Sequence, residues 1–458
     1  MEDIIVKVIE NLKDEFIEFF SRTPKIDDVE NFTFEKLKNI ALQLTKDYAE
    51  EVDAALYANK KGRRAAGLAV ERKGDRRTIL TSIGDISYSR TYYALKDGTY
   101  DYPVDSVLGI ENYQRVSTKV VLSLANEVKT QSYTKASKII TKGNVSKQTV
   151  MNAVRQCEAN NDVQGELRSV PVLHIDADED HVSLQNGRTM MIPLVSVYEG
   201  LEKIGNGKHP RHRCINVFHI AGMKPGEDFW ETVYERINER YDLSETKVYI
   251  HGDGALWIKT GLDFFDNPVY VLDAYHRNKY KKMFFAGCKK GEAVNEKRRL
   301  NVAFQKGNYA LLNELFKIRL KQNPEASKSI KAAYIYLRDN LDAIAVRYKD
   351  PEARNGGATE PHVSHVLSNR LSSRPMGWSV KTLKHLVPML ASEGITLIPK
   401  KTEKPIEIAE KVAKKVARRK VKRNLRSLSI DPDGIVVPPV VANGQVTPLF
   451  QVIKGLGC

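Results

Sequence analysis

The chain has 458 residues, enough for several domains and a well-buried core. Lysine and arginine outnumber aspartate and glutamate by 72 to 57, and the formal net charge of +15 favours a polyanionic partner, nucleic acid first, over an acidic small substrate. No apolar run approaches the roughly 18 residues of a membrane span, and the acidic, amphipathic start is unlike a signal peptide. We therefore expect a cytoplasmic protein with no membrane partner. The four cysteines have no paired spacing, which excludes a disulfide framework and a zinc ribbon.

Residues 1–110 form the first predicted region. Apolar residues recur at helical spacing up to about residue 60 and predict two or three helices, which serve as scaffold or as a dimerising element. The stretch RTILTSIGDISYSRTYY, residues 77–93, then alternates with a period of two. It predicts a β-hairpin that turns at Gly84-Asp85.

Residues 111–165 are predicted to be helical and contain a segment typical of a helix-turn-helix. Its first helix has an apolar face of Ala136, Ile139 and Ile140, Gly143-Asn144 breaks the chain, and Ser146 is placed to cap a second helix. The exposed side of that second helix is predicted to carry Lys147, Gln148, Asn152 and Arg155. Glutamine and asparagine read adenine edges in a major groove and lysine binds phosphate, although an ordinary helical hairpin has the same spacing.

From residue 166 the order of strands and helices predicts an α/β fold. Three strands form a meander with an Asn-Gly turn between the first two, and helix, strand, helix and strand follow up to residue 277. This order predicts a mixed five-stranded sheet with helices on its faces. The remaining predicted segments are a charged α-helical insertion (278–355), a return to the core (356–400), and a basic helix with a C-terminal tail (401–458).

Acidic residues mark one edge of this predicted sheet. Asp176 and Asp178 lie in the first strand and Asp253 ends the fourth, so a fourth strand parallel to the first brings them together. Glu360 opens a helix whose other charged groups are basic. Crowded carboxylates require cations, and Mg²⁺ or Mn²⁺ suits oxygen ligands, which predicts a site for two ions. The simpler alternatives are a turn at Asp253-Gly254 and a favourable helix-dipole position for Glu360.

Four stretches resemble bacterial insertion-sequence transposases of the Lre type, which are similar to the Mutator-like group. They are LHIDADEDHVSLQ, VYIHGDGALWIK, VLDAYHRNKY and EPHVSHVLSNRLSSRPMGWS. The resemblance covers nearly the whole chain and implies an RNase H-like catalytic domain with an Asp-Asp-Glu triad on two divalent ions. The matching positions are Asp178, Asp253 and Glu360. Asp176 is a rival for the first acid and a further metal ligand, because Glu179 follows Asp178 where relatives tend to have glycine.

Further residues around these motifs have two interpretations each. The resemblance implies a positioning role for Asp273 and His276, whereas the simpler alternative is a structural hydrogen bond. His362, His365, Arg370 and Arg374 follow Glu360 at mostly helical intervals and either contact phosphate and the flanking strand or cap and solvate the helix. Phosphate contact is favoured for Arg370 and Arg374, while Trp378 is predicted to pack in the core. The basic stretch 411–426 either binds nucleic acid or forms a solvated face.

The expected function is therefore a DNA transposase that cleaves and joins the ends of its own insertion sequence. Its expected partners are double-stranded DNA, as terminal inverted repeats and as target, and a second copy of the chain in a homodimer or higher homo-oligomer. We expect it in the cytoplasm, associated with the nucleoid when bound to DNA. Two alternatives stay open: a stand-alone Mg²⁺-dependent nuclease, and a non-catalytic, transposase-derived DNA-binding protein whose affinity falls steeply with salt.

Overall fold

The computed structural model describes residues 13, 15–161, 165–205, 211–289, 291–354, 357 and 359–398, with Glu360 described by its backbone alone. The predicted basic helix and tail beyond residue 400 lie outside these residues. The chain divides into two compact units, one with the described residues up to Ser123 and one formed by Leu124–Ile398. No helix among the described residues is long and apolar enough to cross a membrane.

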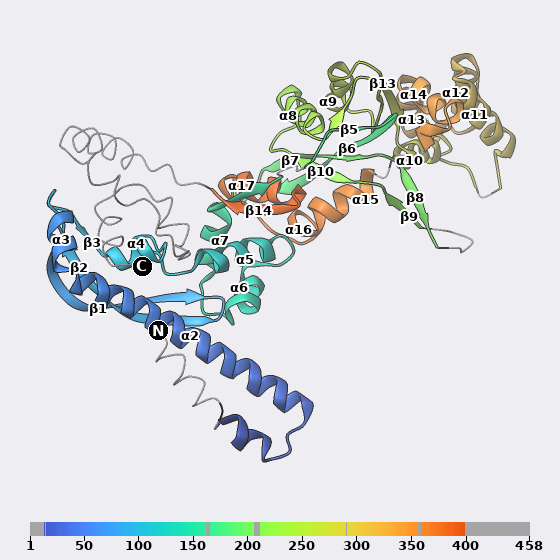
Figure 1. The fold of residues 1–458 in the computed structure, drawn as a ribbon. Coiled ribbons are helices and arrows are strands. Elements are labelled where there is room, and N and C mark those ends of the chain that lie inside the picture. Colours follow the sequence, from blue (N-terminus) through green and yellow to red (C-terminus); the bar gives the residue numbers. More distant parts are fainter. Residues whose placement is uncertain are drawn as a thin grey trace. The chain divides into compact units, whose positions relative to one another are not determined.

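The described part of the first unit combines helices with a β-hairpin, as predicted. Its elements in chain order are α2 (Ile26–Ala58), α3 (Lys60–Ala66), β1 (Ala69–Thr81), β2 (Gly84–Ala94), β3 (Tyr100–Asp101) and α4 (Pro103–Val107). The antiparallel hairpin turns at residues 82–83, because Thr81 pairs with Gly84, so the turn predicted at Gly84-Asp85 was placed two residues too late. Helix α2 buries Ala49 and Leu56 against this hairpin (Figure 1).

A helix pair follows where the helix-turn-helix was predicted. Helix α5 (Thr118–Val128) precedes α6 (Tyr133–Thr141) and α7 (Lys147–Arg155). The hydroxyl of Ser146 accepts the backbone N–H of Thr149 at 3.1 Å, which confirms the predicted cap. The apolar face of α6 was predicted incorrectly, because Ile139 is 51% exposed. The buried face instead continues from Ala136 through Ser137, whose hydroxyl donates to the carbonyl of Val145.

The second unit contains the predicted mixed five-stranded sheet. Its strands are β6 (Val172–Ser183), β7 (Thr189–Tyr198), β10 (Phe218–Ala221), β12 (Lys247–Gly252) and β13 (Pro268–Leu272), in the spatial order β10-β7-β6-β12-β13. The first three strands are antiparallel neighbours, whereas β12 runs parallel to both β6 and β13. The stretch that was predicted to be the third strand forms two strands, β9 (Arg211–Cys214) and β10. Only β10 joins the sheet, because β9 pairs with β8 (Leu201–Ile204).

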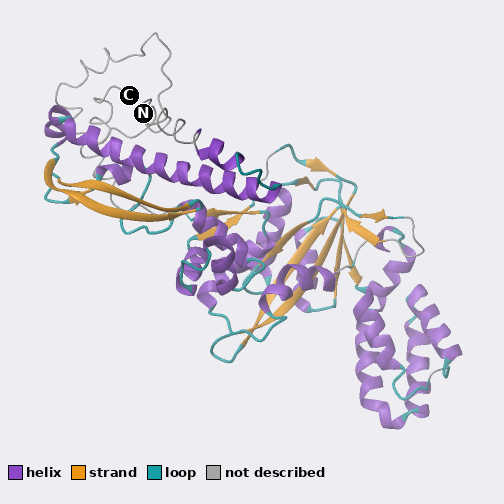
Figure 2. Cartoon of the chain, turned by 90° about the horizontal axis from the view of Figure 1, so that it is seen from below, coloured by secondary structure: helices purple, strands orange, loops and turns teal. Residues whose placement is uncertain are grey.

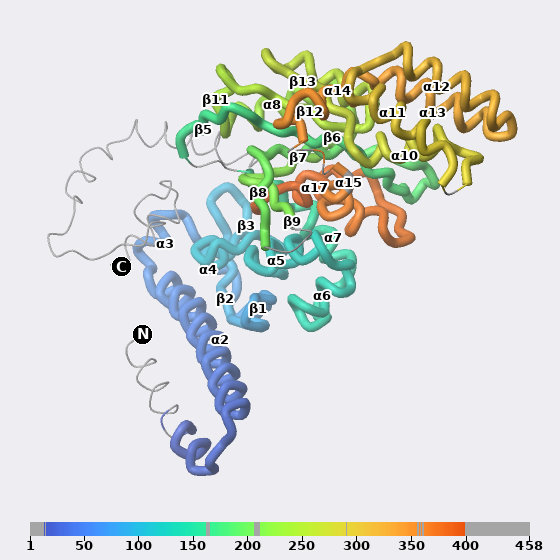
Figure 3. The backbone as a smooth tube through the Cα atoms, turned by 90° about the vertical axis from the view of Figure 1, so that its right-hand side faces the viewer, coloured from blue at the N-terminus to red at the C-terminus, as the bar shows by residue number. Residues whose placement is uncertain are grey.

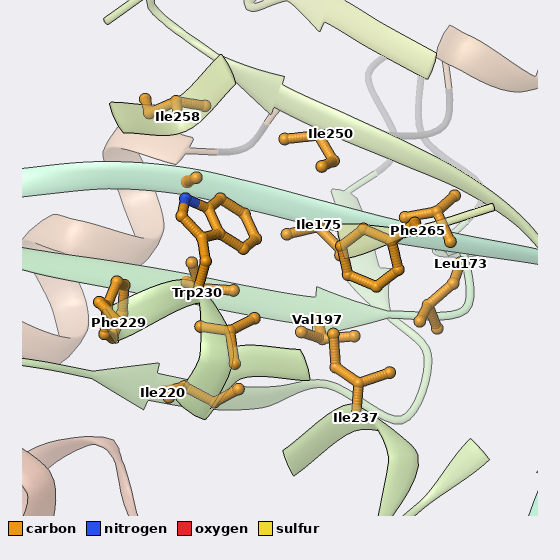
Figure 4. Packing of buried hydrophobic residues seen from close by; sticks show 14 of the residues in the cluster. Leu173, Ile175, Val197, Ile220, Phe229, Trp230, Ile237, Ile250, Ile258 and Phe265 are labelled. Atoms are coloured by element: carbon orange, nitrogen blue, oxygen red, sulfur yellow. The ribbon is translucent and has the colours of Figure 1, made fainter. Parts of the chain in front are cut away.

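One face of this sheet is apolar and carries the main core of the unit. Alternate residues of β6, including Leu173 and Ile175, point to helix α8 (Glu227–Asn238) and the short helices α9 (Leu256–Thr260) and η1 (Gly261–Phe264). Figure 4 shows Trp230 of α8 at the centre of this cluster, and its indole N–H donates to the carbonyl of Trp257 at 2.6 Å.

The opposite face of the sheet is polar and is covered by residues 359–391. Residues of β6 that alternate with the core residues, such as His174 and Asp176, are buried there. The covering elements are α15 (Thr359–Val363), the π-helical turn η4 (Ser364–Ser368), α16 (Asn369–Leu371) and α17 (Val380–Ala391). Figure 3 shows α15 and α17 lying on the side of the sheet away from α8.

The predicted insertion is helical and has its own core. It consists of α10 (Ala274–Phe284), α11 (Val294–Lys306), α12 (Tyr309–Gln322), α13 (Ser327–Asp339) and α14 (Leu341–Lys349). Figure 2 shows these helices as a bundle beside the sheet. Leu272 of the edge strand β13 joins their buried cluster. The remaining short elements are β4 (Cys157–Asn160), β5 (Arg168–Ser169), β11 (Tyr241–Asp242), η2 (Pro324–Ala326), η3 (Glu352–Arg354) and β14 (Gly394–Leu397).

The buried face of β12 offers a stability test. Ile250→Ala removes a fully buried side chain from the core beneath the sheet, so we expect a loss of about 2 to 5 kcal/mol in the second unit. Ile335→Ala makes the same chemical change at a side chain that is 50% exposed and should leave the urea midpoint nearly unchanged. Equal shifts of the two midpoints in urea unfolding would contradict this arrangement of the core.

Candidate catalytic site

Two of the three predicted acids lie level with each other on neighbouring parallel strands, Asp178 within β6 and Asp253 just after β12. The pairing of β12 with β6 matches Ile250 with Ile175 and His251 with Asp176. Continued by two residues, this register places Asp253 level with Asp178. Both carboxyl groups are partly buried, and their charges interact. The register thus places the two acids on neighbouring strands, and that they share a metal site stays a prediction.

The environment of Asp178 disfavours its negative charge. Its pKa is raised to about 7, first because burial removes water from the carboxylate and then because the charges of Asp253 and Glu179 repel it. The backbone N–H of Glu179, which donates to Asp178 Oδ1 at 2.8 Å, and the basic His276 lower it. A carboxylate pair held in this way binds a proton or a cation in preference to remaining doubly ionised.

Asp273 extends this row of acids to a third strand. It follows β13 directly, its backbone N–H donates to the carbonyl of Gly252, and its side chain caps α10 by accepting the N–H of His276 at 2.9 Å. Its second oxygen lies 2.9 Å from His276 Nδ1, and this hydrogen bond raises the pKa of His276. The Asp-x-x-His pair is therefore a helix cap. The charges of Asp178 and Asp253 also raise the pKa of the His276 imidazole.

The helical insertion fixes the backbone at Asp253. The hydroxyl of Tyr336 on α13 donates to the carbonyl of Asp253, and the ring of Tyr336 stacks on that of Tyr280 with centroids 3.6 Å apart. Asp253 itself turns the chain, since its Oδ1 accepts the N–H of Ala255 at 2.8 Å. Gly254 has φ +98°, and a Cβ there would lie 2.9 Å from Asn340 Oδ1, so this turn requires glycine.

Asp176 occupies a different position from Asp178. Its carboxylate is 2% exposed and accepts the hydroxyl of Tyr198 at 3.1 Å and the backbone N–H of Gly357 at 3.0 Å. The imidazole of His362 lies 3.4 Å from its second oxygen. His362 also approaches Cys214 with its other nitrogen, at 3.6 Å, so it is an interior residue and not an exposed phosphate contact.

The third predicted acid, Glu360, lies in α15 as expected from the sequence, with the helix beginning one residue earlier at Thr359. Helix α15 packs against β6, the strand of Asp178. The π-helical turn η4 follows at once, and such turns often occur at functional sites. The Glu360 side chain lies outside the described atoms. Among the described residues no group of three or more His, Cys, Asp or Glu is arranged as a metal site.

The donor chemistry of the described part nevertheless fits a divalent cation. Asp178 and Asp253 supply carboxylate oxygens, which Mg²⁺ and Mn²⁺ prefer, and their mutual repulsion is what a cation relieves. These two carboxylates would hold such an ion.

The basic residues after Glu360 separate into interior and exposed ones. Arg370 is 5% exposed, its Nε donates to the carbonyl of Val128 at 2.6 Å, and its guanidinium lies over the ring of Trp378 at 4.6 Å. Such a buried group is not placed to bind phosphate, which corrects the expectation for Arg370. Trp378 is buried, as predicted. His365 and Arg374 are exposed, and phosphate contact stays a prediction for them.

The residues predicted to read DNA lie mostly as expected. Lys147, Gln148 and Asn152 are exposed on one side of α7, and the Gln148 amide donates to Asn152 Oδ1 at 3.0 Å. Arg155 lies elsewhere, because its guanidinium donates to the hydroxyls of Ser379 and Thr382 at the start of α17. Arg155 therefore joins α7 to α17 and is not part of the exposed row.

Sequence analysis missed the residues that hold the acids in place. Tyr198, Tyr336 and Asn340 reach the site from a strand and from the insertion. Their residue types are common in cores, and no local spacing connects them with the acids. Asn340 lies between α13 and α14, where asparagine is a common capping residue, so its residue type indicates a helix boundary and not a site.

The raised pKa of Asp178 predicts how stability depends on pH without divalent metal. Between about pH 4 and 7 the folded state holds a proton that the unfolded state releases, so stability falls as the pH rises through this window. The shift from 3.8 to about 7 corresponds to at most about 4 kcal/mol.

Asp178→Asn is neutral at every pH and should be more stable than the wild type at pH 8, with little difference near pH 4. Thermal unfolding in EDTA across this range measures the effect. Asp253→Asn should act in the same direction but less strongly, because it removes only the repulsion. An unchanged slope in Asp178→Asn would contradict the assigned environment.

Comparison with known proteins places the chain in a family. The model described as "Uncharacterised protein family (UPF0236)" matches residues 24–404. A UPF0236 protein of Caldanaerobacter subterraneus subsp. tengcongensis is 34% identical over 423 residues, which cover 89% of this chain and 86% of that protein. Another from the same organism is 34% identical over 480 residues, covering 99% of this chain and 97% of the relative.

A more distant relative, named as a UPF0236 protein in the vanSb 3′ region of Streptococcus gallolyticus, is 22% identical over 338 residues and covers 69% of this chain and 72% of its own. The names of the first two relatives join eleven and four locus designations of one organism. Because the family model matches most of this chain, the chain belongs to the UPF0236 family.

Proposed function

We propose that this protein is a DNA transposase, which uses divalent metal ions held by Asp178, Asp253 and Glu360 to cleave DNA and transfer strands at the ends of its own insertion sequence. The observation that carries the proposal is that the β12–β6 register, continued by two residues, sets Asp253 level with Asp178 of the neighbouring parallel strand, where burial and mutual repulsion raise the pKa of Asp178 to about 7. Two Mg²⁺ or Mn²⁺ ions, when bound, stabilise the attacking and leaving oxygens of a phosphoryl transfer.

The strand order supports an RNase H-like assignment for the sheet. Three antiparallel strands in sequence order are followed by two strands parallel to the first, with helices between them. Ligands of such open sheets bind beyond the carboxyl ends of parallel strands. Asp253 and Asp273 directly follow the carboxyl ends of β12 and β13, and Asp178, within the longer strand β6, is level with Asp253.

The protein groups divide the chemical work among them. Asp178 and Asp253 supply the anionic oxygens, and Tyr336 holds the Asp253 backbone from the insertion. His276 stays oriented by Asp273 and faces the acids, where its raised pKa favours the protonated ring. A protonated imidazole at this position stabilises a neighbouring phosphate oxygen, so we assign His276 to substrate phosphate positioning.

DNA recognition is assigned to the helix pair α6 and α7, which we propose to be a helix-turn-helix. Its support is the exposed row of Lys147, Gln148 and Asn152 on α7 together with the net charge of +15. The proposal includes a homodimer or higher homo-oligomer, since two element ends are handled together. It also includes a cytoplasmic location, at the nucleoid when bound to DNA.

The relatives' names add independent support. Eleven locus designations for one relative, within one organism, are the multiplicity that an element able to move itself leaves in a genome. A stand-alone nuclease or a non-catalytic DNA-binding protein gives no reason for that multiplicity. It is therefore the comparison that favours strand transfer over hydrolysis alone.

The catalytic test uses DNA carrying the inverted ends of the protein's own element. We expect Mn²⁺- or Mg²⁺-dependent cleavage, and we expect Asp253→Ala and Asp178→Ala to reduce it by at least about 1,000-fold, because the acids act as a unit. Asp266→Ala, at an exposed acid just before β13, is the matched control and should retain activity.

Pre-cleaved ends separate the candidate functions. Strand-transfer products from them support a transposase, hydrolysis without transfer identifies a nuclease, and metal-independent binding without chemistry identifies a DNA-binding protein. Full activity of Asp253→Ala would overturn the proposed site.

The recognition helix gives a second test. Asn152→Ala and Gln148→Ala should each weaken binding to element ends by about 1 to 3 kcal/mol and relax base preference. Lys147→Ala should instead weaken binding to all sequences and reduce the slope of log affinity against log salt by about 1. Gln43→Ala, an exposed glutamine in the first unit, is the control. Unaltered base preference in Asn152→Ala would remove α7 from the reading role.

A further inference from the structure

Asp176 has a set of contacts that a metal ligand does not need. Its Oδ1 accepts two hydrogen bonds, from the hydroxyl of Tyr198 at 3.1 Å and from the backbone N–H of Gly357 at 3.0 Å. The same Gly357 N–H lies 3.2 Å from the Tyr198 hydroxyl oxygen, so strand β6, strand β7 and the chain before α15 meet at one carboxylate. The residue is almost fully buried, at 2% exposed.

These contacts bracket Glu360 along the chain. Gly357 lies three residues before it and His362, whose Nδ1 is 3.4 Å from Asp176 Oδ2, lies two residues after it. A short helix of five residues has little stability of its own, so its position depends on what it packs against. Asp176 thus holds the chain just before α15 by the hydrogen bond from Gly357, while His362, on the other side of Glu360, packs beside it with its Nδ1 not hydrogen-bonded to any described residue.

The register separates Asp176 from the acid pair. Asp176 is level with His251 on β12, a fully buried imidazole, whereas Asp178 is level with Asp253 by continuation of the same register. The buried side chains next to Asp176 are Tyr198, Ser196 across β7 and His362 from α15. Asp176 therefore lies one step deeper in the sheet, away from the strand ends.

We propose that Asp176 is a positioning residue, which locks α15 to β6 and so presents Glu360 to the ions held by Asp178 and Asp253, and that it is not itself a metal ligand. The inference rests on the proposed function of the three acids. It assigns the first acid of the triad to Asp178 by giving its rival a separate task. Tyr198 shares that task through its hydroxyl.

The discriminating variant is Asp176→Asn. Asparagine keeps an oxygen that accepts the hydrogen bonds of Tyr198 and Gly357, so the clamp survives, whereas a metal ligand loses its charge. We expect Asp176→Asn to keep cleavage and Mn²⁺ affinity within about tenfold of the wild type, and Asp176→Ala to lose about 10- to 100-fold in both. Asp178→Asn, the matched change two residues on, should abolish cleavage.

Two readouts do not depend on DNA chemistry. Calorimetric titration with MnCl₂ measures metal affinity of the free protein, and amide hydrogen exchange measures Gly357 and residues 359–363. Asp176→Ala and, more weakly, Tyr198→Phe should speed exchange in this segment while β12 stays protected. Ser196→Ala is the control, since Ser196 faces Asp176 across β7 but hydrogen-bonds His219 and does not contact Gly357.

The outcomes distinguish the role of Asp176 from the proposed function of the protein. If Asp176→Asn loses cleavage and Mn²⁺ binding as completely as Asp178→Asn, Asp176 is a ligand and the inference is wrong, although the proposed function stands. If Asp178→Asn and Asp253→Ala change neither Mn²⁺ affinity nor cleavage, the proposed function fails. If Asp176→Ala keeps β12 protected and the amide of Gly357 still exchanges at the wild-type rate, Asp176 does not hold α15 and the inference is also wrong.

Discussion

The parallel hydrogen-bonded register of β12 on β6 is the constraint on which the site depends. It brings Asp253 level with Asp178 although the two are far apart in the chain, and β13 adds Asp273 by the same parallel pairing. Charges placed in this way repel one another, and the apolar core under the sheet, around Trp230, must hold the strands against that repulsion. The site is thus a strained arrangement of charge on a rigid support.

Groups outside the sheet orient the acids. The insertion reaches the backbone of Asp253 through Tyr336, and the segment before α15 reaches β6 through the Gly357 N–H and the carboxylate of Asp176. Neither contact uses a carboxylate oxygen of Asp178 or Asp253. The insertion and α15 therefore act as supports of the acid pair, which gives the interruption of the α/β order a structural purpose.

The sequence predicted the sheet because its strands and turns have local signals. The alternation in 170–184 and the Asn186-Gly187 turn define β6 and β7, and Asp253-Gly254 marks the end of β12. The burial of individual side chains was harder to predict. Ile139 is exposed and Arg370 is buried, because a helix face is decided by its partners and not by residue type alone. The clamp at Asp176 joins residues 181 positions apart in the chain, which no local pattern encodes.

Anomalous diffraction from crystals grown with MnCl₂ and an element-end DNA tests the central claim most directly. The account predicts two manganese peaks about 3.5 to 4 Å apart, bounded by the carboxylates of Asp178, Asp253 and Glu360, with Asp176 still bonded to the Gly357 amide. Manganese peaks coordinated by other residues would contradict it. So would a complex with ordered DNA in which the Glu360 carboxylate does not bind the ions.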